Sequence, residues 1–456
     1  MLAPIRVKQG NEKLTGHSGL RLIGILLEST QLRERLEQIA NVHCVDPYYS
    51  HADILISMTG LISIGKPDYD AIEIFRSKPE FFINTLGISA CPSSVTLRQR
   101  IDLIGNAANT IIKEESASMV FAKAPAITPI ETGLGLLIPL DIDVSPFDNS
   151  KSSKEGVSRT YKGCDGFAPI FAYLGREGYL VNVELRNGSQ HCQKNTPQFI
   201  METLDYARKI TTERILMRLD SGNDSQDNFP DPECYEGVEF IIKRNLRRES
   251  LAAWLVLSQK KGDLTINSER KRVRLGKTTT GIKGQELPCP IIFKVTERYM
   301  KKDQKLLFPE IEVETYWCGM DKMEPVEVIE LYHDHGTSEQ FHSELKSDMG
   351  IERLPSGHFA SNDLVLHLGM LSYNILRIIG QEWAEDNETE SLRLPRTRRK
   401  KVTRRRLRTV VQDLIYMAGR LIKTGRQYFI SFGQLNPFAG LWERISLRLE
   451  GTPALE

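Results

Sequence analysis

The stretch that decides the fold is LDIDVS, residues 140–145, in which apolar and acidic residues alternate. A period of two is typical of a β-strand, and it places Asp141 and Asp143 on one face of that strand. Pro139 has no N–H to donate, so we expect the strand to begin there and not to run through it.

The residues that follow continue a sheet. FAPIFAYL (167–174) and YLVNVELR (179–186), separated by GREG, predict a hairpin. NTPQFIMETLDYARKI (195–210) has a threonine cap and a proline in its first turn, so it predicts a helix. A buried strand then ends at Asp220, and GVEFIIKRN (237–245) predicts another. This order predicts a mixed α/β sheet.

The flanking regions have other patterns. Residues 18–120 have apolar residues at spacings of three and four, which predicts helices. One of these helices carries Arg98 near its start, so the region is either a small helical DNA-binding module or a scaffold with surface arginines. Residues 255–325 alternate and are rich in Thr, Val and Gly, which predicts a β-rich insertion. After residue 330 helical patterns return, including one over 408–425.

The composition excludes several classes of protein. The 456 residues are 40% hydrophobic and 26% charged, as in soluble globular proteins. The N-terminus has no apolar segment, so we expect no secretory signal and a cytoplasmic protein. The longest apolar stretch, 364–379, is interrupted by polar residues, which favours a buried helix over a membrane span. Seven scattered cysteines without a CxxC pair predict reduced thiols.

The net charge of +1 hides an asymmetry. RLPRTRRKKVTRRRLR, residues 393–408, contains ten Arg or Lys and no acid, which leaves 50 basic against 59 acidic residues elsewhere. Such a block is typical of contact with a polyanion, although a solvated basic linker has the same composition. We interpret it as a nucleic-acid contact. The residues that would make it are Arg398, Arg399, Lys400, Lys401, Arg404, Arg405 and Arg406.

The acids that close the predicted strands are candidate metal ligands. Carboxylates at the carboxyl ends of neighbouring strands point toward the crevice where ligands bind in α/β sheets. Asp143, or Asp141, together with Asp220 and an acid from a later helix could hold two Mg²⁺ ions for phosphoryl transfer. With 59 acids in the chain, such a triple is weak evidence without a further motif.

That motif lies in YHDHGTSEQFHSELKSDMG, residues 332–350. On one continuous helix, Tyr332, His335, Glu339 and Lys346 share a stripe. The pattern Thr-Ser-Glu-Gln from Thr337 favours instead a helix that begins there, and Glu339 and Lys346 still share a face. A zinc or iron site at His333, Asp334, His335, Glu339 and His342 is a further reading, but two imidazoles in an H-x-H pair point the same way only on a strand.

The spacing Y-x2-H-x3-E-x6-K closely resembles the Y-x2-R-x3-E-x6-K signature of DDE transposases of bacterial insertion sequences, the hairpin-forming group. LDIDVS resembles the first-aspartate motif of this family, and RLDSG resembles the second. The stretch from ELKSDMG to SYNILR is similar to the branch called insertion-sequence family thirteen-eighty. The resemblance covers residues 15–440, with the motifs in the same order.

By resemblance, the catalytic and metal-binding triad is Asp143, Asp220 and Glu339, with two Mg²⁺ ions that Mn²⁺ can replace. Tyr332 and Lys346 match residues that contact phosphates at the transposon end. His335 stands where the family has Arg and cannot offer a two-pronged phosphate contact. The β-rich insertion of such enzymes holds a flipped base on an aromatic side chain, for which Trp317 and Trp254 are candidates, although each could be a core residue.

The resemblance implies a ribonuclease-H-like catalytic core with a β-rich insertion, flanked by helical N- and C-terminal regions. It implies a homodimer that acts on terminal inverted repeats and target DNA, cuts and pastes DNA, and passes through a hairpin intermediate. The rivals are a catalytically inactive, repurposed DNA-binding protein and a plain metal-dependent nuclease. The expected units are a helical DNA-binding domain (1–130), the first part of the core (131–254), the insertion (255–325), the second part of the core (326–380) and a basic helical C-terminal region (381–456).

Overall fold

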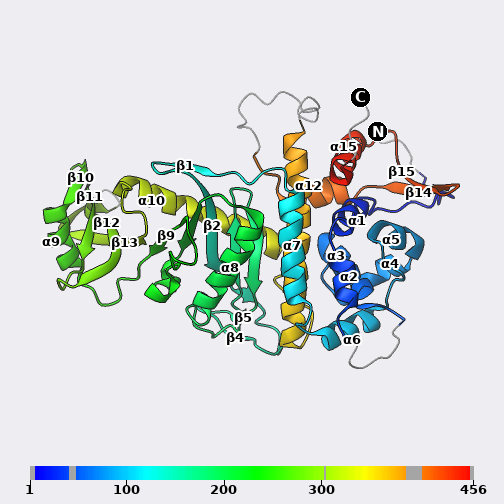
Figure 1. Ribbon diagram of the computed structural model, residues 1–456, viewed down its shortest axis with the longest axis horizontal. Coiled ribbons are helices and arrows are strands. Elements are labelled where there is room, and N and C mark those ends of the chain that lie inside the picture. The colour runs from blue at the N-terminus through cyan, green and yellow to red at the C-terminus, as the bar shows by residue number, and fades with distance from the viewer. Residues whose placement is uncertain (1–5, 41–47, 302–303, 387–402, 452–456) are drawn as a thin grey trace.

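The computed structural model describes residues 6–40, 48–301, 304–386 and 403–451. Within these residues one ten-stranded mixed sheet runs through the molecule in the order β10-β11-β12-β13-β9-β8-β2-β6-β7, with β1 paired to β2 (Figure 1). In the central part, β2 is antiparallel to β6 and parallel to β8, and β8 is parallel to β9. The central strands are β2 (Gly135–Val144), β6 (Ile170–Leu174), β7 (Tyr179–Glu184), β8 (Ile215–Leu219) and β9 (Val238–Lys243).

The strand β2 runs through Pro139, so the prediction that it begins there was wrong. The N–H of Ile138 donates to Arg214 on the β8 side, which turns the nitrogen of Pro139 to the opposite side. On that side β1 pairs only as far as Leu137 and β6 pairs only from Leu140. The proline therefore lies at a gap between two partner strands, where no N–H is needed.

The predicted hairpin of β6 and β7, the helix and the next two strands are confirmed. Helix α8 (Thr196–Ile210) connects β7 to β8 and buries Phe199, Leu204 and Ala207. Short elements surround this core: β1 (Ile130–Thr132), β3 (Phe147–Asp148), β4 (Ser158–Arg159), β5 (Asp165–Phe167), η2 (Ser221–Asn223) and η3 (Gln226–Asn228).

The β-rich insertion extends the same sheet, because β13 pairs with β9 from Tyr316 to Cys318. It begins with a helix, α9, that the sequence pattern did not predict. Ser250 accepts the N–H of Ala253 at its start, and Trp254 buries its ring against Phe293 at 5.9 Å between centroids. The elements are α9 (Leu251–Lys261), β10 (Gly262–Asn267), β11 (Lys271–Thr280), β12 (Glu286–Lys301) and β13 (Gln304–Cys318).

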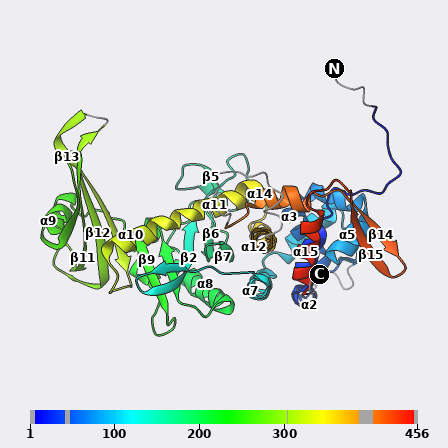
Figure 2. The ribbon, with the colours of Figure 1, turned by 90° about the horizontal axis from the view of Figure 1, so that it is seen from above.

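A nearly straight helical rod follows the insertion and lies across the sheet, as Figure 2 shows. It consists of α10 (Pro325–His333), a 3-10 turn η4 (Asp334–Thr337), α11 (Ser338–Ser343) and a π-helical turn η5 (Glu344–Asp348). His333 and Ser338, which flank the turn η4, both have helical backbone angles. The helix therefore does not begin at Thr337, and the continuous alternative is the one observed.

The helical N-terminal region was predicted and is confirmed, and it packs on the long helix α12 (Phe359–Glu385). Helix α3 (His51–Ser63) is buried along its whole length, and α7 (Asn109–Lys123) lies against α12 as well. One hydrophobic core joins these helices to the central sheet. The remaining helices are α1 (Leu20–Glu28), α2 (Leu32–Glu37), η1 (Tyr69–Ile72), α4 (Glu73–Arg76), α5 (Pro79–Leu86) and α6 (Ser94–Ile104).

The C-terminal region is only partly helical. The helix expected over 408–425 ends at Ile415, and a hairpin with its turn at Gly425 (φ 62°) follows. RLIKTGRQYFISF alternates around a glycine, so here the period of two describes the structure better than the period of 3.6. The elements are α14 (Leu407–Val410), η6 (Val411–Ile415), β14 (Gly419–Thr424), β15 (Gln427–Phe432) and α15 (Ala439–Glu450).

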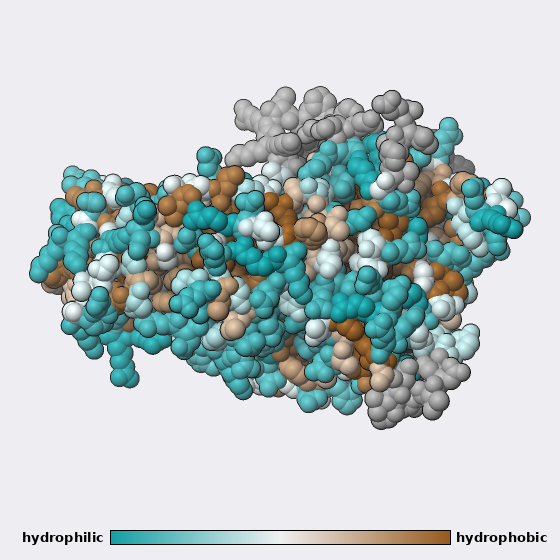
Figure 3. Space-filling model, in the orientation of Figure 1, coloured by the Kyte–Doolittle hydropathy of each residue, from teal (hydrophilic) through white to brown (hydrophobic). Residues whose placement is uncertain are grey.

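The face of the molecule drawn in Figure 3 is mostly hydrophilic, with small, scattered hydrophobic patches. Among the helices that the structure describes, none is long and apolar enough to cross a membrane. The segment around Leu364–Ile379 lies inside α12 and is buried against neighbouring helices and strands.

Candidate active site

Two aspartates meet at one edge of the sheet. Asp143 lies at the end of β2 and Asp220 directly follows β8, and these parallel strands are aligned with Ile142 opposite Leu219. Burial raises the pKa of Asp220, and the negative charge of Asp143 raises it further. Two carboxylates that disfavour each other's charge form a place where a cation would be stabilising.

The carboxylate of Asp143 is held from two sides. The N–H of Val144 donates to Oδ1 at 2.8 Å, and Nε2 of His342 lies 3.1 Å from Oδ2. The other ring nitrogen of His342 is 3.1 Å from the hydroxyl of Tyr173. Burial alone would raise the pKa of Asp143, but the hydrogen bond and charge of His342, the charge of His335 and the N–H of Val144 together outweigh burial, and the pKa is lowered.

Asp141, on the same face of β2, is in a different environment. It is 2% exposed, and Arg218 donates to both of its oxygens at 2.6 and 2.8 Å. Nδ1 of His335 lies 2.8 Å from Oδ1. Burial would raise the pKa of Asp141, yet Arg218 and His335 lower it. Asp141 is thus enclosed by Arg218 and His335, whereas Asp143 keeps 20% of its side chain exposed.

Glu339 lies on α11, one turn before His342, and its side chain is exposed. Within the described ranges, no three His, Cys, Asp or Glu side chains lie close enough together to hold a metal ion. The structure therefore brings Asp143 and Asp220 together but does not bring the carboxylate of Glu339 to them. The histidines of the alternative zinc or iron site are also apart, since His335 faces Asp141 and His342 faces Asp143.

The other residues of the signature line the rod near this edge. The ring of Tyr332 packs on Tyr316, with centroids 4.9 Å apart, and burial followed by the charge of Asp220 raises its pKa. Nζ of Lys346 donates to the carbonyl of Pro146 at 2.6 Å, and burial lowers its pKa. His335 is 7% exposed, so its ring faces the protein interior and not the solvent.

The described part of the basic block binds the rod. Arg404 donates to both oxygens of Glu344 at 3.0 and 3.1 Å and to Gln340 at 3.0 Å. Arg406 donates to both oxygens of Asp348 at 2.8 and 3.0 Å. Arg405 lies over the ring of Trp383, and Arg98 is exposed on α6. Arg398, Arg399, Lys400 and Lys401 lie outside the described residues.

Both candidate tryptophans are buried. Trp254 is 1% exposed and donates its N–H to Glu249 at 2.9 Å, and Trp317 is 5% exposed and donates to Asp224 at 2.8 Å. The guanidinium of Arg244 lies between them, 5.9 Å from the ring of Trp254 and 4.7 Å from that of Trp317. Trp317 also lines a cavity of about 680 Å³.

That cavity is lined by a group of residues that the sequence reasoning missed. RNLRR, residues 244–248, directly follows β9, so it lies at the same edge of the sheet as the two aspartates. Arg247 has a positive φ of 51°, and its N–H donates to Asn245 while its guanidinium donates to the carbonyl of Asp224. The available signal was Arg244 near the end of the predicted strand 237–245, followed closely by Arg247 and Arg248.

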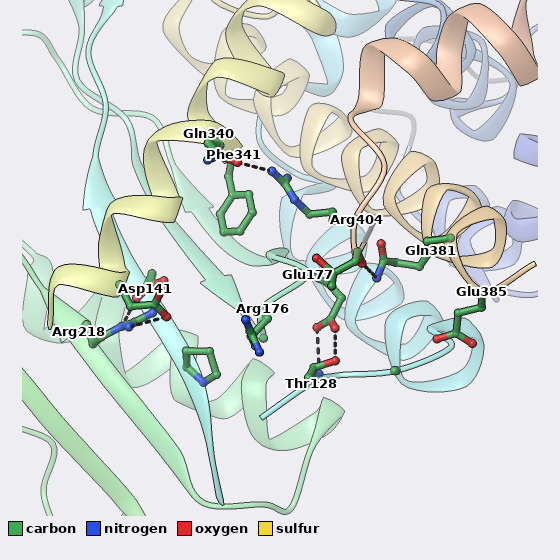
Figure 4. Close-up of a pocket in the computed structure, with 16 residues that line it drawn as sticks. Thr128, Asp141, Arg176, Glu177, Arg218, Gln340, Phe341, Gln381, Glu385 and Arg404 are labelled. Atoms are coloured by element: carbon green, nitrogen blue, oxygen red, sulfur yellow. Dashed lines mark hydrogen bonds and ion pairs between the residues drawn. The ribbon is translucent and has the colours of Figure 1, made fainter. Parts of the chain in front are cut away.

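A second cavity, of about 560 Å³, lies between the rod, α12 and the sheet (Figure 4). Several of the polar groups that line it are bonded to one another: Asp141 to Arg218, Thr128 to Glu177, and Gln340 to Arg404. Because these groups satisfy one another, the cavity is better described as a space beneath the rod than as a binding site.

The chemistry of the two open carboxylates fits a hard divalent cation. Mg²⁺ and Mn²⁺ prefer carboxylate oxygens, and the pKa of Asp220 is raised first by burial and then by the charge of Asp143, so a cation here would stabilise the ionised form of both groups. Asp143 and Asp220 are the residues that would hold such an ion, with Glu339 as a further donor if its side chain turns toward them.

Comparisons with known proteins indicate the family of the chain. No curated protein matches the chain. Two solved structures are distantly similar: the piggyBac transposase synaptic complex with hairpin DNA (9% identity, 96% of this chain and 82% of that chain, TM-score 0.41) and the NurA nuclease from Sulfolobus solfataricus (12% identity, 50% and 81%, TM-score 0.20). The family model described as transposase DDE domain group 1 matches residues 3–454. Because this match spans nearly the whole sequence, the chain belongs to the DDE transposase family, domain group 1.

Proposed function

We propose that this transposase cuts and pastes an insertion sequence by metal-dependent phosphoryl transfer, with Asp143, Asp220 and Glu339 as its metal-binding carboxylates. The observation that carries the proposal is the placement of Asp143 and Asp220 side by side at the carboxyl ends of two parallel strands. The central strand order β7-β6-β2-β8-β9, antiparallel on one side of β2 and parallel on the other, supports a ribonuclease-H-like core.

Glu339 is within reach of this pair through the geometry of its helix. His342 already contacts Asp143, and residues three apart on a helix have Cβ atoms about 5–6 Å apart. A glutamate side chain with three rotatable bonds can cover such a distance. The exposed position of Glu339 is therefore compatible with its joining the site when cation and DNA are bound.

The residues divide the reaction among them. When bound, the divalent ions would lower the pKa of the attacking water and stabilise the departing 3′ oxygen. Asp143 and Asp220 would hold these ions from the sheet, and Glu339 would hold them from the rod. Lys346, whose ammonium is held beside the site by the carbonyl of Pro146, offers a positive charge for a strand phosphate.

The DNA partners are proposed from the family to which the chain belongs. We expect a homodimer that brings two terminal inverted repeats together, forms a hairpin during excision and transfers the freed 3′ ends to target DNA. Trp317, at the wall of the cavity formed by the RNLRR loop, is the better candidate for stacking on a flipped base. Stacking on an aromatic ring is worth about 1–3 kcal/mol per base, comparable to the cost of flipping.

The test is cleavage of linear DNA that carries the element's own ends, with Mg²⁺ or Mn²⁺. Wild type is compared with Glu339→Gln and with Glu330→Gln, a matched change of an exposed glutamate on the same rod. We expect metal-dependent nicks and hairpins from wild type and Glu330→Gln and none from Glu339→Gln, while all three bind the ends.

Two other results would contradict the proposed function or the proposed role of Glu339. If the wild-type protein binds the ends tightly and cleaves nothing, the protein is a repurposed DNA-binding protein. If Glu339→Gln cleaves as well as wild type, Glu339 is not the third carboxylate.

A further inference from the structure

His342 connects three elements at the candidate active site. It projects from α11, its Nε2 meets Asp143 on β2 at 3.1 Å, and its Nδ1 meets the hydroxyl of Tyr173 on β6 at 3.1 Å. The ring is 6% exposed and packs against Phe171 and Tyr173, with centroids 5.2 and 5.3 Å apart. Its orientation is thus fixed both by packing and by a bond at each nitrogen.

The direction of these bonds follows from their partners. An ionised carboxylate only accepts hydrogen bonds, so Nε2 of His342 donates to Asp143. In a neutral imidazole the other nitrogen is then an acceptor, which the hydroxyl of Tyr173 satisfies as a donor. The tyrosine therefore selects the tautomer that presents an N–H to the carboxylate.

The hydrogen bonds from Val144 and His342 leave the carboxylate of Asp143 with a defined number of free lone pairs. Each carboxylate oxygen has two lone pairs. One on Oδ1 is taken by the N–H of Val144 and one on Oδ2 by His342. One lone pair on each oxygen remains for other partners, and the plane of the group is fixed before any such partner arrives.

Another buried histidine shows the contrast. His367 lies inside α12, and its Nδ1 meets the carbonyl of Asp363 in the preceding turn at 2.7 Å. That contact satisfies Nδ1 within its own helix. His342 instead reaches a carboxylate 199 residues away and is held there by a third element.

We propose that His342 is a positioning residue that, oriented by Tyr173, fixes the carboxylate of Asp143 for a divalent cation. The inference rests on the proposed function, because it requires that Asp143 bind the cation. It concerns a residue other than the three carboxylates. It assigns the effect to the N–H that His342 donates to Asp143, and not to the imidazole ring itself. Outer partners that orient a metal ligand typically contribute 10–100-fold to metal affinity.

The experiment measures Mn²⁺ binding to the full chain without DNA, by the electron paramagnetic resonance signal of free Mn²⁺. The variants are His342→Ala, which removes the donor, His342→Gln, which keeps an N–H near the position of Nε2, and Tyr173→Phe, which removes the orienting hydroxyl. Asp143→Asn marks the loss of the site, and His367→Gln is the matched change of a buried histidine elsewhere. Thermal unfolding and binding of DNA ends are measured on each.

The expected results distinguish the hydrogen-bond donor of His342 from its ring as the cause of tight Mn²⁺ binding. His342→Ala should weaken Mn²⁺ binding by about 10–100-fold, with a smaller loss for Tyr173→Phe. His342→Gln and His367→Gln should bind Mn²⁺ as wild type does. DNA ends should bind to all variants equally, since the change lies at the ion and not at the phosphate contacts.

Each contrary result has its own meaning. If His342→Ala binds Mn²⁺ like wild type, the positioning role is refuted while the metal site stands. If His342→Gln is as weak as His342→Ala, the imidazole itself ligates the ion or only fills space, and the inference is again wrong. If Asp143→Asn binds Mn²⁺ as tightly as wild type, the proposed metal site fails and the inference fails with it.

Discussion

Arg218 holds both carboxylate oxygens of Asp141, with Nε 2.6 Å from Oδ1 and Nη2 2.8 Å from Oδ2. The two residues lie opposite each other on β2 and β8 and are both nearly fully buried. Two positions further along β2, Asp143 meets no such cation. One strand thus carries two aspartates with separate tasks, one that joins two strands and one that faces the open edge of the sheet.

The first prediction separates these tasks. Asp141→Asn leaves the buried charge of Arg218 without its counter-ion, so we expect the free energy of unfolding to fall by about 3–5 kcal/mol. Asp143→Asn should change it by only about 1 kcal/mol, and it should abolish DNA cleavage. Urea unfolding and cleavage of end-carrying DNA measure the two effects. A stable Asp141→Asn protein that no longer cleaves, beside an active Asp143→Asn protein, would reverse the assignment.

The sequence predicted the elements that local pattern controls. LDIDVS, the hairpin after it and helix α8 follow from periods of two and 3.6 and from the proline in the first turn of α8. The predicted threonine cap of α8 is wrong, because Thr196 lies inside the helix and Asn195 precedes it without a side-chain cap bond. The edge that holds Asp143 and Asp220 follows from parallel strands ending together. The start of β2 was predicted wrongly at Pro139. A proline is tolerated inside β2 because β1 stops pairing before it and β6 begins pairing after it, which depends on residues outside the strand itself.

The roles of charged side chains were harder to predict, because their partners are distant in sequence. The position of Arg404 in a run of arginines predicts a phosphate contact, yet the carboxylate that it binds in the structure, Glu344, lies 60 residues earlier. His342 reads as a surface histidine or a zinc ligand, and nothing local indicates Asp143 or Tyr173. Conversely, the local pattern of RNLRR indicates only the end of a strand, although its position after β9 places it beside the aspartates.

The second prediction concerns Arg404. It bonds Glu344 and Gln340 and lies 4.7 Å from the ring of Phe341, so its charge serves the rod. Arg404→Gln should lower the free energy of unfolding by about 1.5–3 kcal/mol. The dependence of log K on log salt for end binding should stay unchanged. A slope flattened by about 0.9 would instead show that Arg404 contacts a phosphate of duplex DNA.

The matched variant neutralises the four residues that lie outside the described ranges, Arg398, Arg399, Lys400 and Lys401. If the sequence-based prediction for them is right, the slope falls by about 0.9 for each phosphate that the protein no longer neutralises, without a change in unfolding. An unchanged slope would make this part of the block a linker.

The third prediction concerns the RNLRR loop. Arg247 and Arg248 are exposed at the cavity that follows β9, at the same edge of the sheet as Asp220, and the N–H of Arg247 donates to Asn245. The double change of both arginines to Gln should weaken binding of DNA ends and reduce the salt slope by about 0.9 for each phosphate that these arginines neutralise. Arg426→Gln, an exposed arginine in the turn of the C-terminal hairpin, is the control and should bind as wild type does. Equal binding by all three proteins would remove the loop from the DNA path.

The fourth prediction concerns pH and His367, a buried histidine of α12. The ring is 3% exposed inside α12, and its Nδ1 meets the carbonyl of Asp363. Burial lowers its pKa from the ordinary 6.5, against the opposing effect of the nearby Asp363 carboxylate, while Lys113 lowers it further. The folded protein therefore keeps this histidine neutral under conditions in which the unfolded chain protonates it.

The direction of the pH effect on stability follows from proton binding by the folded and unfolded states. Below pH 6.5 the unfolded state takes up a proton that the folded state refuses, so His367 reduces stability as the pH falls toward its lowered pKa, and it contributes no pH dependence above 6.5. The slope is at most about 1.4 kcal/mol per pH unit for one proton. His367→Gln cannot titrate, so urea unfolding at a series of pH values should show the wild type losing more stability than the variant on acidification. Parallel curves would mean that His367 titrates alike in both states, and therefore that its burial does not exclude the proton.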